Sequence, residues 1–282
     1  MIRLSKVHGL GNDFLIADLR SASPSPSPLD PGFARRLCDR RFGIGADGVL
    51  GIVPSSLAVA GMRIRNADGS EPEMCGNGIR CVAKYLYDEG LRRPSIAIET
   101  AAGVLDCAVE EGPDGHAARV TVAMGRPRVE TLQDAIEAGG RIFDIVRVSM
   151  GNPHAITFVE GGDLLELAER FGPDIERHAR FPGRTNVEFA RVNDAGIDLR
   201  VWERGCGITL ACGTGACATA AAAVATGRLE AGSDIEVRLP GGLLSIRVAP
   251  DLTQVWMTGP AVHVGDVVLS DDWLRYASDP AR

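Results

Sequence analysis

Two cysteines are the residues of this chain best suited to chemistry. Cys75 and Cys212 lie in the related segments 74–78 (MCGNG) and 211–215 (ACGTG), where glycines open an apolar, helix-like run. At the first turn of a helix, unpaired backbone N–H groups and the positive dipole end favour a thiolate. Glycine leaves those N–H groups open to an anion, so each helix start could also hold a substrate carboxylate. The sequence therefore predicts two helix ends that together make one site.

The chain repeats itself around these two cysteines, which are 137 residues apart. Nine residues before each cysteine stands a polar residue at the end of an expected strand, Asn66 in the first copy and Glu203 in the second. Two further pairs of segments match at offsets of 140 and 139 residues, namely 11–13 with 151–153 and 95–105 with 234–244. A period this long indicates two copies of one domain rather than a solenoid of short repeats.

The duplication sets the expected domain organisation, because 282 residues suffice for two domains of about 140 residues each. We expect a first domain of residues 1–119, to which the end of the chain, 265–282, returns. The second domain is expected to comprise residues 120–264. In each copy, short strands flank one apolar helix, which predicts a curled sheet wrapped around that helix.

Both cysteine motifs are expected to begin helices. These helices should cover 76–89, with Gly90 as its stop, and 213–226, whose small residues indicate burial. We expect further helices at 31–41 and 163–179, and a solvated loop in the Ser/Pro-rich tract 21–28. Strands are expected at two places within 4–18 and at 49–53, 62–65, 95–100, 104–110, 118–124, 142–149, 155–159, 186–192, 197–203 and 254–257, with a hairpin at 234–248.

Composition excludes several classes of partner. The net charge is −7, with 45% hydrophobic and 24% charged residues, as in an ordinary globular protein. This acidity, without a basic block, argues against nucleic acid or an anionic membrane surface. The start of the chain lacks the apolar core of a signal peptide, and the longest alanine-rich run, 216–225, is too short to span a membrane. With seven widely spaced cysteines, the chain is expected to be cytoplasmic and largely free of disulfides.

Cofactor chemistry finds little support among the remaining residues. The segment 43–48 (GIGADG) formally matches a dinucleotide fingerprint, but the expected helix precedes it and a strand follows, so we interpret it as a turn. A pyridoxal cofactor needs a lysine, and the only two, Lys6 and Lys84, lie in an expected strand and on a helix flank. Zinc is disfavoured because the cysteine spacings lack the C-x-x-C pattern. The five other cysteines are expected to be structural: Cys38, Cys81, Cys107, Cys206 and Cys217.

Three polar residues of the second copy are further candidates. His154 follows the segment 151–153, and a lone histidine near a strand start is often only a hydrogen-bonded structural group. Glu203 and Arg204 end an apolar strand and could form an exposed ion pair of little energetic value. The register of Glu203 against Cys212 favours a functional role for this pair.

Taken together, these segments resemble the diaminopimelate epimerase family, in the same order and from residue 4 to about residue 267. The segments that carry the resemblance are 8–14 (HGLGNDF), 66–70 (NADGS), 75–81 (CGNGIRC), 151–154 (GNPH), 203–205 (ERG) and 211–217 (ACGTGAC). The resemblance implies an α+β fold of two pseudo-symmetric domains, each a rolled antiparallel sheet or barrel around a central helix, with the active site between them. It also implies a homodimer that interconverts LL- and meso-2,6-diaminopimelate without cofactor or metal, in lysine and peptidoglycan-precursor biosynthesis.

The resemblance also implies roles for individual residues. Cys75 and Cys212 would be the acid/base pair, assisted by His154 and Glu203. The substrate would be bound by Asn12, Asn66, Gly76, Asn77, Asn152, Asn186, Glu203, Arg204, Gly213 and Thr214. One departure is visible, because some members of the family carry glutamine where this chain has Gly48, so a side-chain contact there is absent or replaced.

The chemistry of the residues agrees with an epimerase. Inverting an α-carbon requires a base on one face and an acid on the other, and a cysteine from each copy supplies both. Converging helix-terminal N–H groups would stabilise the charge that develops on the substrate carboxylate. Two alternatives remain. One is a racemase of the proline-racemase type, whose first motif is similar to Cys-Gly-His-Gly rather than to the Cys-Gly-Asn-Gly of this chain. The other is a non-catalytic thiol protein that binds a carboxylate ligand.

Overall fold

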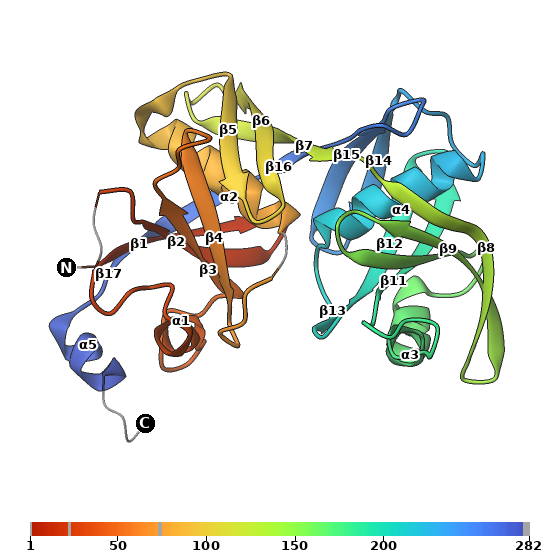
Figure 1. Cartoon of the computed structure of the whole chain (residues 1–282), viewed down its shortest axis with the longest axis horizontal. Helices are drawn as coiled ribbons and strands as arrows, with labels where there is room; N and C mark the ends of the chain where they lie inside the picture. The colour runs from red at the N-terminus through yellow and green to blue at the C-terminus, as the bar shows by residue number, and fades with distance from the viewer. Residues whose placement is uncertain (1, 22–23, 73–74, 279–282) are drawn as a thin grey trace. The chain divides into compact units, whose positions relative to one another are not determined.

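The chain forms two compact units. The computed structural model describes residues 2–21, 24–72 and 75–278, so Met74 of the first motif and residues 22–23 of the Ser/Pro-rich tract lie outside the description. The first unit comprises Met1–Val120 with Pro260–Arg282, and the second comprises Thr121–Gly259 (Figure 1). The division expected from the sequence differs by one residue at the first boundary and by five at the second.

The first unit is a curved, mixed sheet around one helix. Its strands pair in the order β17, β1, β2, β3, β4, β5, β6. The pairs β2/β3 and β4/β5 are parallel and the other four are antiparallel. The elements are β1 (Arg3–Gly9), β2 (Asn12–Asp18), α1 (Pro31–Cys38), β3 (Gly48–Val53), β4 (Ala60–Asn66), α2 (Gly76–Leu86), a π-turn (Tyr87–Leu91), β5 (Ser95–Thr100), β6 (Gly103–Glu111), β17 (Val262–Val268) and α5 (Asp271–Ala277).

The second unit repeats this plan. Its strands pair in the order β8, β9, β10, β11, β12, β14, β15, β16, and again the third and fifth pairings, β10/β11 and β12/β14, are parallel. Strand β7 (Ala117–Gly125) contains the boundary between the units. The elements that follow are β8 (Arg128–Ala138), β9 (Arg141–Ser149), β10 (Pro153–Phe158), α3 (Leu164–Glu176), β11 (Asn186–Asn193), β12 (Gly196–Glu203), β13 (Gly207–Ile208), α4 (Gly213–Ala225), β14 (Asp234–Leu239), β15 (Gly242–Val248) and β16 (Val255–Pro260). The shared order of pairings confirms the duplicated α+β plan.

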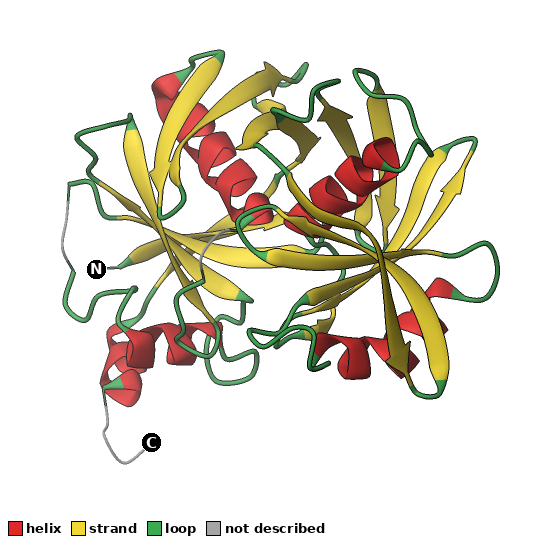
Figure 2. Ribbon diagram, turned by 45° about the vertical axis from the view of Figure 1, so that its right-hand side comes forward, coloured by secondary structure: helices red, strands yellow, loops and turns green. Residues whose placement is uncertain are grey.

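The central helix of each unit is enclosed by its strands, as Figure 2 shows for α2 and α4. Ten of the eleven residues of α2 and eleven of the thirteen of α4 are buried. Helix α4 is built from alanine, glycine, threonine, cysteine and one valine, so the sheet can approach its backbone from every side. The small residues of this segment therefore reflect burial, as the sequence predicts.

Several boundaries differ from those expected. Helix α2 ends at Leu86 and continues as the π-turn, in which Gly90 takes a φ of 105° and stops the helical path. Helix α1 ends at Cys38, three residues early, and α3 ends at Glu176. Four elements were not anticipated: β8, β13, β17 and α5. In the described residues, no helix is long and apolar enough to cross a membrane.

Aromatic packing defines the core of the second unit. Phe143 meets Phe171 and Phe189 edge-on, with ring centroids 4.9 and 5.8 Å apart. The three rings lie in a cluster of buried residues between β8, β9, β11 and α3. Edge-to-face pairs add to the free energy gained from burying the rings themselves. This cluster includes Ala155 on β10 and Val187 on β11, and it therefore fixes the strands that carry His154 and Glu188.

We expect Phe189→Ala to lower the free energy of unfolding of the second unit by about 3–5 kcal/mol, because it removes a fully buried ring and leaves a cavity. Phe42→Ala is the matched control, since that ring is 67% exposed and its loss should cost less than about 0.5 kcal/mol. Urea unfolding followed by circular dichroism measures both. Equal effects of the two substitutions would contradict this description of the core.

Candidate active site

Cys75 caps the central helix of the first unit. Its backbone is extended, with φ −141° and ψ 101°, and its sulfur accepts a hydrogen bond from Gly78 N at 3.2 Å. The side chain is half-buried. A Cβ at Gly78 would lie 3.3 Å from that sulfur, so glycine permits the close approach of sulfur and helix backbone. The expected placement of this cysteine at a helix start is confirmed.

Cys212 occupies the same position at the start of α4. Its sulfur accepts from Gly215 N at 3.4 Å and lies 3.6 Å from the Thr214 hydroxyl. Unlike Cys75, it is buried. Burial raises the pKa of the Cys212 thiol well above its ordinary value, and the nearby carboxylates of Glu203 and Glu188 raise it further. The expectation of a lowered thiol pKa is therefore wrong for Cys212, because loss of solvation outweighs the helix dipole.

A chain of amide groups leads to Cys75 in the first unit. The fully buried Arg80 donates to Asn77 Oδ1 at 3.0 Å, and Asn77 Nδ2 donates to Asn12 Oδ1 at 3.1 Å. Asn12 Nδ2 in turn donates to Asp47 Oδ2 at 2.7 Å. These contacts fix which way each amide faces. As a result, Asn12 Oδ1 is the atom that lies 4.0 Å from the Cys75 sulfur.

Charged residues anchor the far end of this chain. Arg40 bridges Asp13 and Asp47 at 2.6 and 2.8 Å, and Lys6 binds Asp13 and the Gly45 carbonyl. Burial alone would raise the pKa of Asp13, but the hydrogen bonds from Arg40 and Lys6 lower it to about 2. Asp13 therefore remains a carboxylate at neutral pH and holds the turn that carries Asn12.

The end of strand β4 carries Asn66, whose side-chain amide donates to Ser70 Oγ at 3.0 Å. Asn66 pairs directly with Gly48 on β3. A Cβ at Gly48 would lie 2.6 Å from the Arg65 carbonyl oxygen, so this backbone leaves no room for the glutamine of some family members. The site of the first unit therefore lacks a side chain at this strand position.

In the second unit, polar side chains converge on the start of α4. Asn152 Nδ2 donates to Thr214 Oγ1 at 3.2 Å, and the amide oxygen of Asn152 lies 3.0 Å from His154 Nε2. His154 is 1% exposed, and its Nδ1 lies 2.7 Å from Glu188 Oε1. His154 is thus a buried histidine at the start of β10 whose ring links two polar groups, Glu188 and Asn152.

A tight turn positions Arg204. The Arg204 amide donates to Asn186 Oδ1 at 2.9 Å, and Asn186 Nδ2 donates to the Pro153 carbonyl at 2.9 Å. The buried Glu176 accepts from Gly205 N at 3.0 Å and from Trp202 Nε1 at 2.8 Å. Glycine at 205 takes a φ of 77°, which suits a turn of this kind.

The structure thus gathers the candidate residues into two groups. The first-unit group holds Asn12, Cys75, Gly76 and Asn77, with Asn66 at the end of β4, and the second-unit group holds Asn152, His154, Asn186, Glu203, Arg204, Cys212, Gly213 and Thr214. Sequence reasoning missed four residues that hold these groups in place: Asp47, Arg80, Glu176 and Glu188. A charged residue within an otherwise apolar run was the available signal for Arg80 and Glu188.

Other candidate positions have structural surroundings. Lys84 donates to the Ala117 carbonyl at 2.7 Å and pairs with Asp88 at 2.9 Å, as expected for a helix-flank residue. Four of the five cysteines expected to be structural are buried, but Cys206 is exposed, so the burial argument is wrong there. This difference arises because Cys206 lies in the turn after Glu203.

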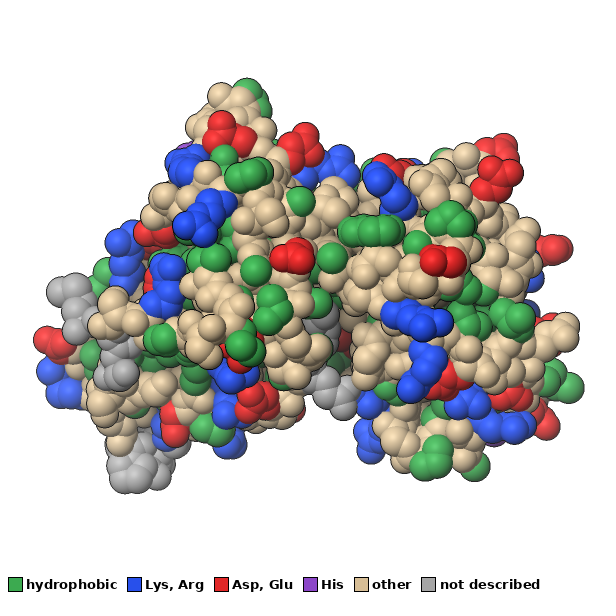
Figure 3. Space-filling view, turned by 45° about the horizontal axis from the view of Figure 1, so that its top comes forward, with side chains coloured by type: hydrophobic (Ala, Val, Ile, Leu, Met, Phe, Trp, Pro, Cys, Tyr) green, Lys and Arg blue, Asp and Glu red, His purple; other side chains and the backbone are tan. Residues whose placement is uncertain are grey.

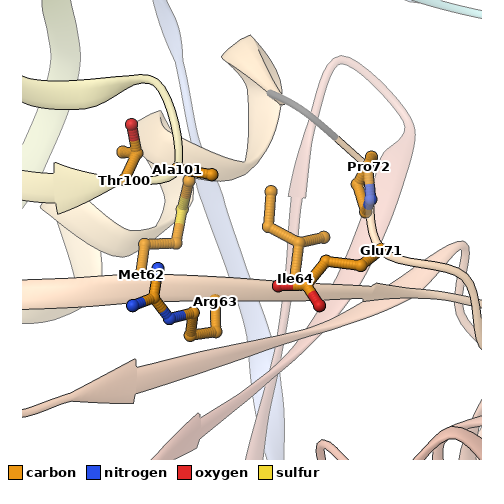
Figure 4. Close-up of a pocket in the computed structure, with 7 residues that line it drawn as sticks. All are labelled: Met62, Arg63, Ile64, Glu71, Pro72, Thr100 and Ala101. Atoms are coloured by element: carbon orange, nitrogen blue, oxygen red, sulfur yellow. The ribbon is translucent and has the colours of Figure 1, made fainter.

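The first unit holds a small pocket beside strand β4. Met62, Arg63 and Ile64 of β4 form one side of it, and Glu71, Pro72, Thr100 and Ala101 complete its lining (Figure 4). None of the residues predicted from the sequence to bind substrate lines this pocket. On the surface drawn in Figure 3, acidic and basic side chains are interspersed.

Solved structures share this fold. A probable proline racemase from Agrobacterium radiobacter K84, solved with bound carbonate, aligns with a TM-score of 0.76 at 19% identity, over 99% of this chain and 95% of that one. A hydroxyproline epimerase from Agrobacterium vitis, with bound trans-4-hydroxy-L-proline, aligns with a TM-score of 0.72 at 21% identity, over 99% and 98%. The chain therefore has the fold of these two solved structures. In this chain, a cysteine stands at the start of each central helix.

Sequence comparison identifies the family. The family model for diaminopimelate epimerase matches residues 4–130 and 146–264. A diaminopimelate epimerase from Desulfitobacterium hafniense is 46% identical over 287 residues, covering 97% of this chain and all of the relative. The chain belongs to the diaminopimelate epimerase family and is an enzyme of the isomerase class.

The raised pKa of Cys212 predicts its reactivity. Because the thiolate is the nucleophile, iodoacetamide should modify Cys212 at least tenfold more slowly than the exposed Cys206 at pH 7.5. Its rate should still be rising above pH 9, where a free thiol with a pKa of about 8.5 approaches its plateau. Mass spectrometry of peptides sampled over time measures both rates. Urea-unfolded protein, in which both thiols are accessible to iodoacetamide, is the control. A Cys212 rate that levels off below pH 8.5 in folded protein would contradict a raised pKa of this thiol.

Proposed function

We propose that this enzyme interconverts LL- and meso-2,6-diaminopimelate without a cofactor or metal, in lysine and peptidoglycan-precursor biosynthesis in the cytoplasm. The observation that carries the proposal is the pair of equivalent cysteines, each of which caps the buried central helix of its unit. The names of the relatives support the substrate. The remaining steps follow from the chemistry of an α-carbon.

Two thiols suit this reaction because inversion needs a base on one face of the carbon and an acid on the other. We propose that Cys75 and Cys212 serve the two faces, one as thiolate and one as thiol. The raised pKa of Cys212 supports its role as the acid of the resting enzyme, which leaves Cys75 as the base. After one turnover the protonation states are exchanged, and the enzyme is ready for the reverse reaction.

The α-proton is a weak acid beside a thiol, so most of the rate enhancement must come from stabilising the charge that develops on the substrate carboxylate. Backbone N–H groups at the starts of α2 and α4, including those of Gly76 and Gly213, are suited to this task. Asn12, Asn77 and Thr214 lie beside the same helix starts and would orient the reacting end of the substrate.

Recognition of the distal end requires a second charged group. Arg204 offers a planar pair of donors for a carboxylate, and the turn that carries it is held by Asn186 and Glu176. We propose that Asn66, Asn152 and Asn186 supply further polar contacts to the substrate. Glu203 and His154 would assist the thiols, as the proximity of the Glu203 carboxylate to Cys212 supports.

We also propose that the enzyme is a homodimer. Strand β17 pairs with β1, and three of its side chains, Val262, Val264 and Val268, are 42, 62 and 51% exposed. Exposed apolar residues along a strand are a typical place for another chain to add. A mass measured by light scattering tests this proposal directly.

A racemase acting on proline is the second candidate, since a probable proline racemase has the same fold. The first motif argues against it, because this chain has Asn77 at the position of the histidine in the Cys-Gly-His-Gly motif of proline-type racemases. Incubation with L-proline and with LL-diaminopimelate, followed by chiral chromatography, separates the two. Conversion of proline alone would overturn the proposal.

Cys75→Ala and Cys212→Ala are each expected to abolish conversion of LL- to meso-diaminopimelate, because each removes the only acid/base group on one face. Chiral chromatography of the product measures the loss. Cys206→Ala is the matched control, an exposed cysteine that should leave the rate unchanged. Retention of isomer conversion by either catalytic variant, with its fold intact, would refute the two-thiol scheme.

Arg204→Lys is expected to lower kcat/KM at least tenfold, mainly through KM, because lysine cannot make the paired contact with a distal carboxylate. Arg238→Lys provides the control, since Arg238 lies on β14 and pairs with Asp198 at 3.3 Å. An unchanged kcat/KM in the Arg204 variant would exclude this role.

A further inference from the structure

Glu188 is a buried carboxylate that none of the steps above uses. It lies on β11 with its side chain fully enclosed, and Oε1 is 2.7 Å from His154 Nδ1. A Cβ built at Gly215 would lie 2.8 Å from the same oxygen, so the carboxylate packs against the first turn of α4. The second oxygen, Oε2, is buried without a hydrogen-bond partner among the described residues.

These contacts set the protons of the pair. An isolated negative charge with an unpaired oxygen is costly to bury, which favours a proton held between Oε1 and Nδ1. The other ring nitrogen, Nε2, faces the Asn152 amide oxygen at 3.0 Å, an acceptor that needs a proton on Nε2. Burial raises the pKa of the Glu188 carboxyl, although the facing His154 ring and the Ala155 backbone oppose this, and the net rise agrees with a retained proton.

The hydrogen bonds continue in one direction to the sulfur. Asn152 accepts from His154 through Oδ1 and donates through Nδ2 to Thr214 Oγ1 at 3.2 Å. Because the Thr214 oxygen accepts this bond, its own hydrogen is available to the Cys212 sulfur at 3.6 Å. The chain thus begins at Glu188 and ends with a donor beside Cys212.

We propose that Glu188 is a positioning residue for His154. It keeps a shared proton at His154 Nδ1 and a second proton on Nε2, and thereby directs the Thr214 hydroxyl toward Cys212. In this arrangement the chain stabilises Cys212 whenever it becomes a thiolate during turnover. This inference rests on the proposed function for its kinetic consequence but not for its structural one. The titratable groups facing Cys212 and His154 are Glu188 on β11 and Glu203 on β12.

The structural consequence is tested without substrate. In protein labelled with ¹⁵N-histidine, the His154 ring should carry a proton on Nε2 and share one at Nδ1 from pH 6 to pH 9. In Glu188→Gln, which keeps the shape but cannot hold the shared proton, the ring should lose its second proton at a lower pH than in wild type, because a buried imidazolium without its carboxylate partner is destabilised. His154→Asn identifies the signals, and Glu176→Gln, at a buried carboxylate elsewhere in this unit, should leave them unchanged.

The kinetic consequence is a pH-dependent difference in kcat/KM between wild type and Glu188→Gln, which destabilisation of the fold would not produce. Glu188→Gln should lower kcat/KM about tenfold at pH 8, the size of one charge-assisted hydrogen bond, with KM little changed. The deficit of the variant should shrink as the pH falls, because protonation of the ring from solvent then replaces the proton that Glu188 retains in wild type.

His154 signals that titrate identically in wild type and Glu188→Gln would overturn the proposal. A kcat/KM ratio between the two proteins that is independent of pH would do the same. If wild type fails to convert diaminopimelate at all, the proposed function fails, whereas the ring titration still decides the role of Glu188.

Discussion

Each half of this molecule depends on one interaction, a cysteine sulfur that accepts a hydrogen bond from the backbone at the start of a buried helix. The bonds from Gly78 N and Gly215 N have the same geometry in the two units. Because the helices are enclosed by sheet, their N–H groups are oriented by the fold rather than by ligand. The curved sheets, the glycines and the small residues of α4 all serve to bury these two helix starts.

The duplicated backbone holds two chemically different thiols. Cys75 is half-buried and lies beside neutral amides, whose orientation is fixed by the buried Arg80 and by Asp47. Cys212 is buried beside carboxylates that favour its protonated form. The proposed two-thiol mechanism needs one thiol protonated while the other is charged, and this difference between the units supports it.

The sequence predicted most of the fold because its repeat and its helix starts are local signals. Helix starts at Gly76 and Gly213 and the strand at 95–100 agree with the structure to the residue. Strand β8 was missed because its eleven residues, largely polar and exposed on one face, lack a strong apolar pattern. Strand β17 and helix α5 lie at the end of the chain, where no repeat unit helped to locate them.

The candidate site was predictable in its residues but not in its charges. Motif positions predicted the cysteines and asparagines, yet the raised pKa of Cys212 depends first on its burial and then on the carboxylates of Glu203 and Glu188, which lie on strands β12 and β11. Burial of this kind follows from tertiary packing, and no spacing along the chain reveals it. Likewise, Glu176 supports the turn at Arg204 from a different element, helix α3.

Deuterium incorporation tests the two-thiol account most directly. Fully reduced protein, without added cofactor or metal, is incubated with LL-diaminopimelate in heavy water, and the product is examined by proton NMR. The account predicts that each meso molecule formed carries deuterium at the inverted α-carbon, because the returning proton comes from a solvent-exchanged thiol on the opposite face. Meso product that retains the original hydrogen would contradict it, since one group would then have moved the same proton between faces.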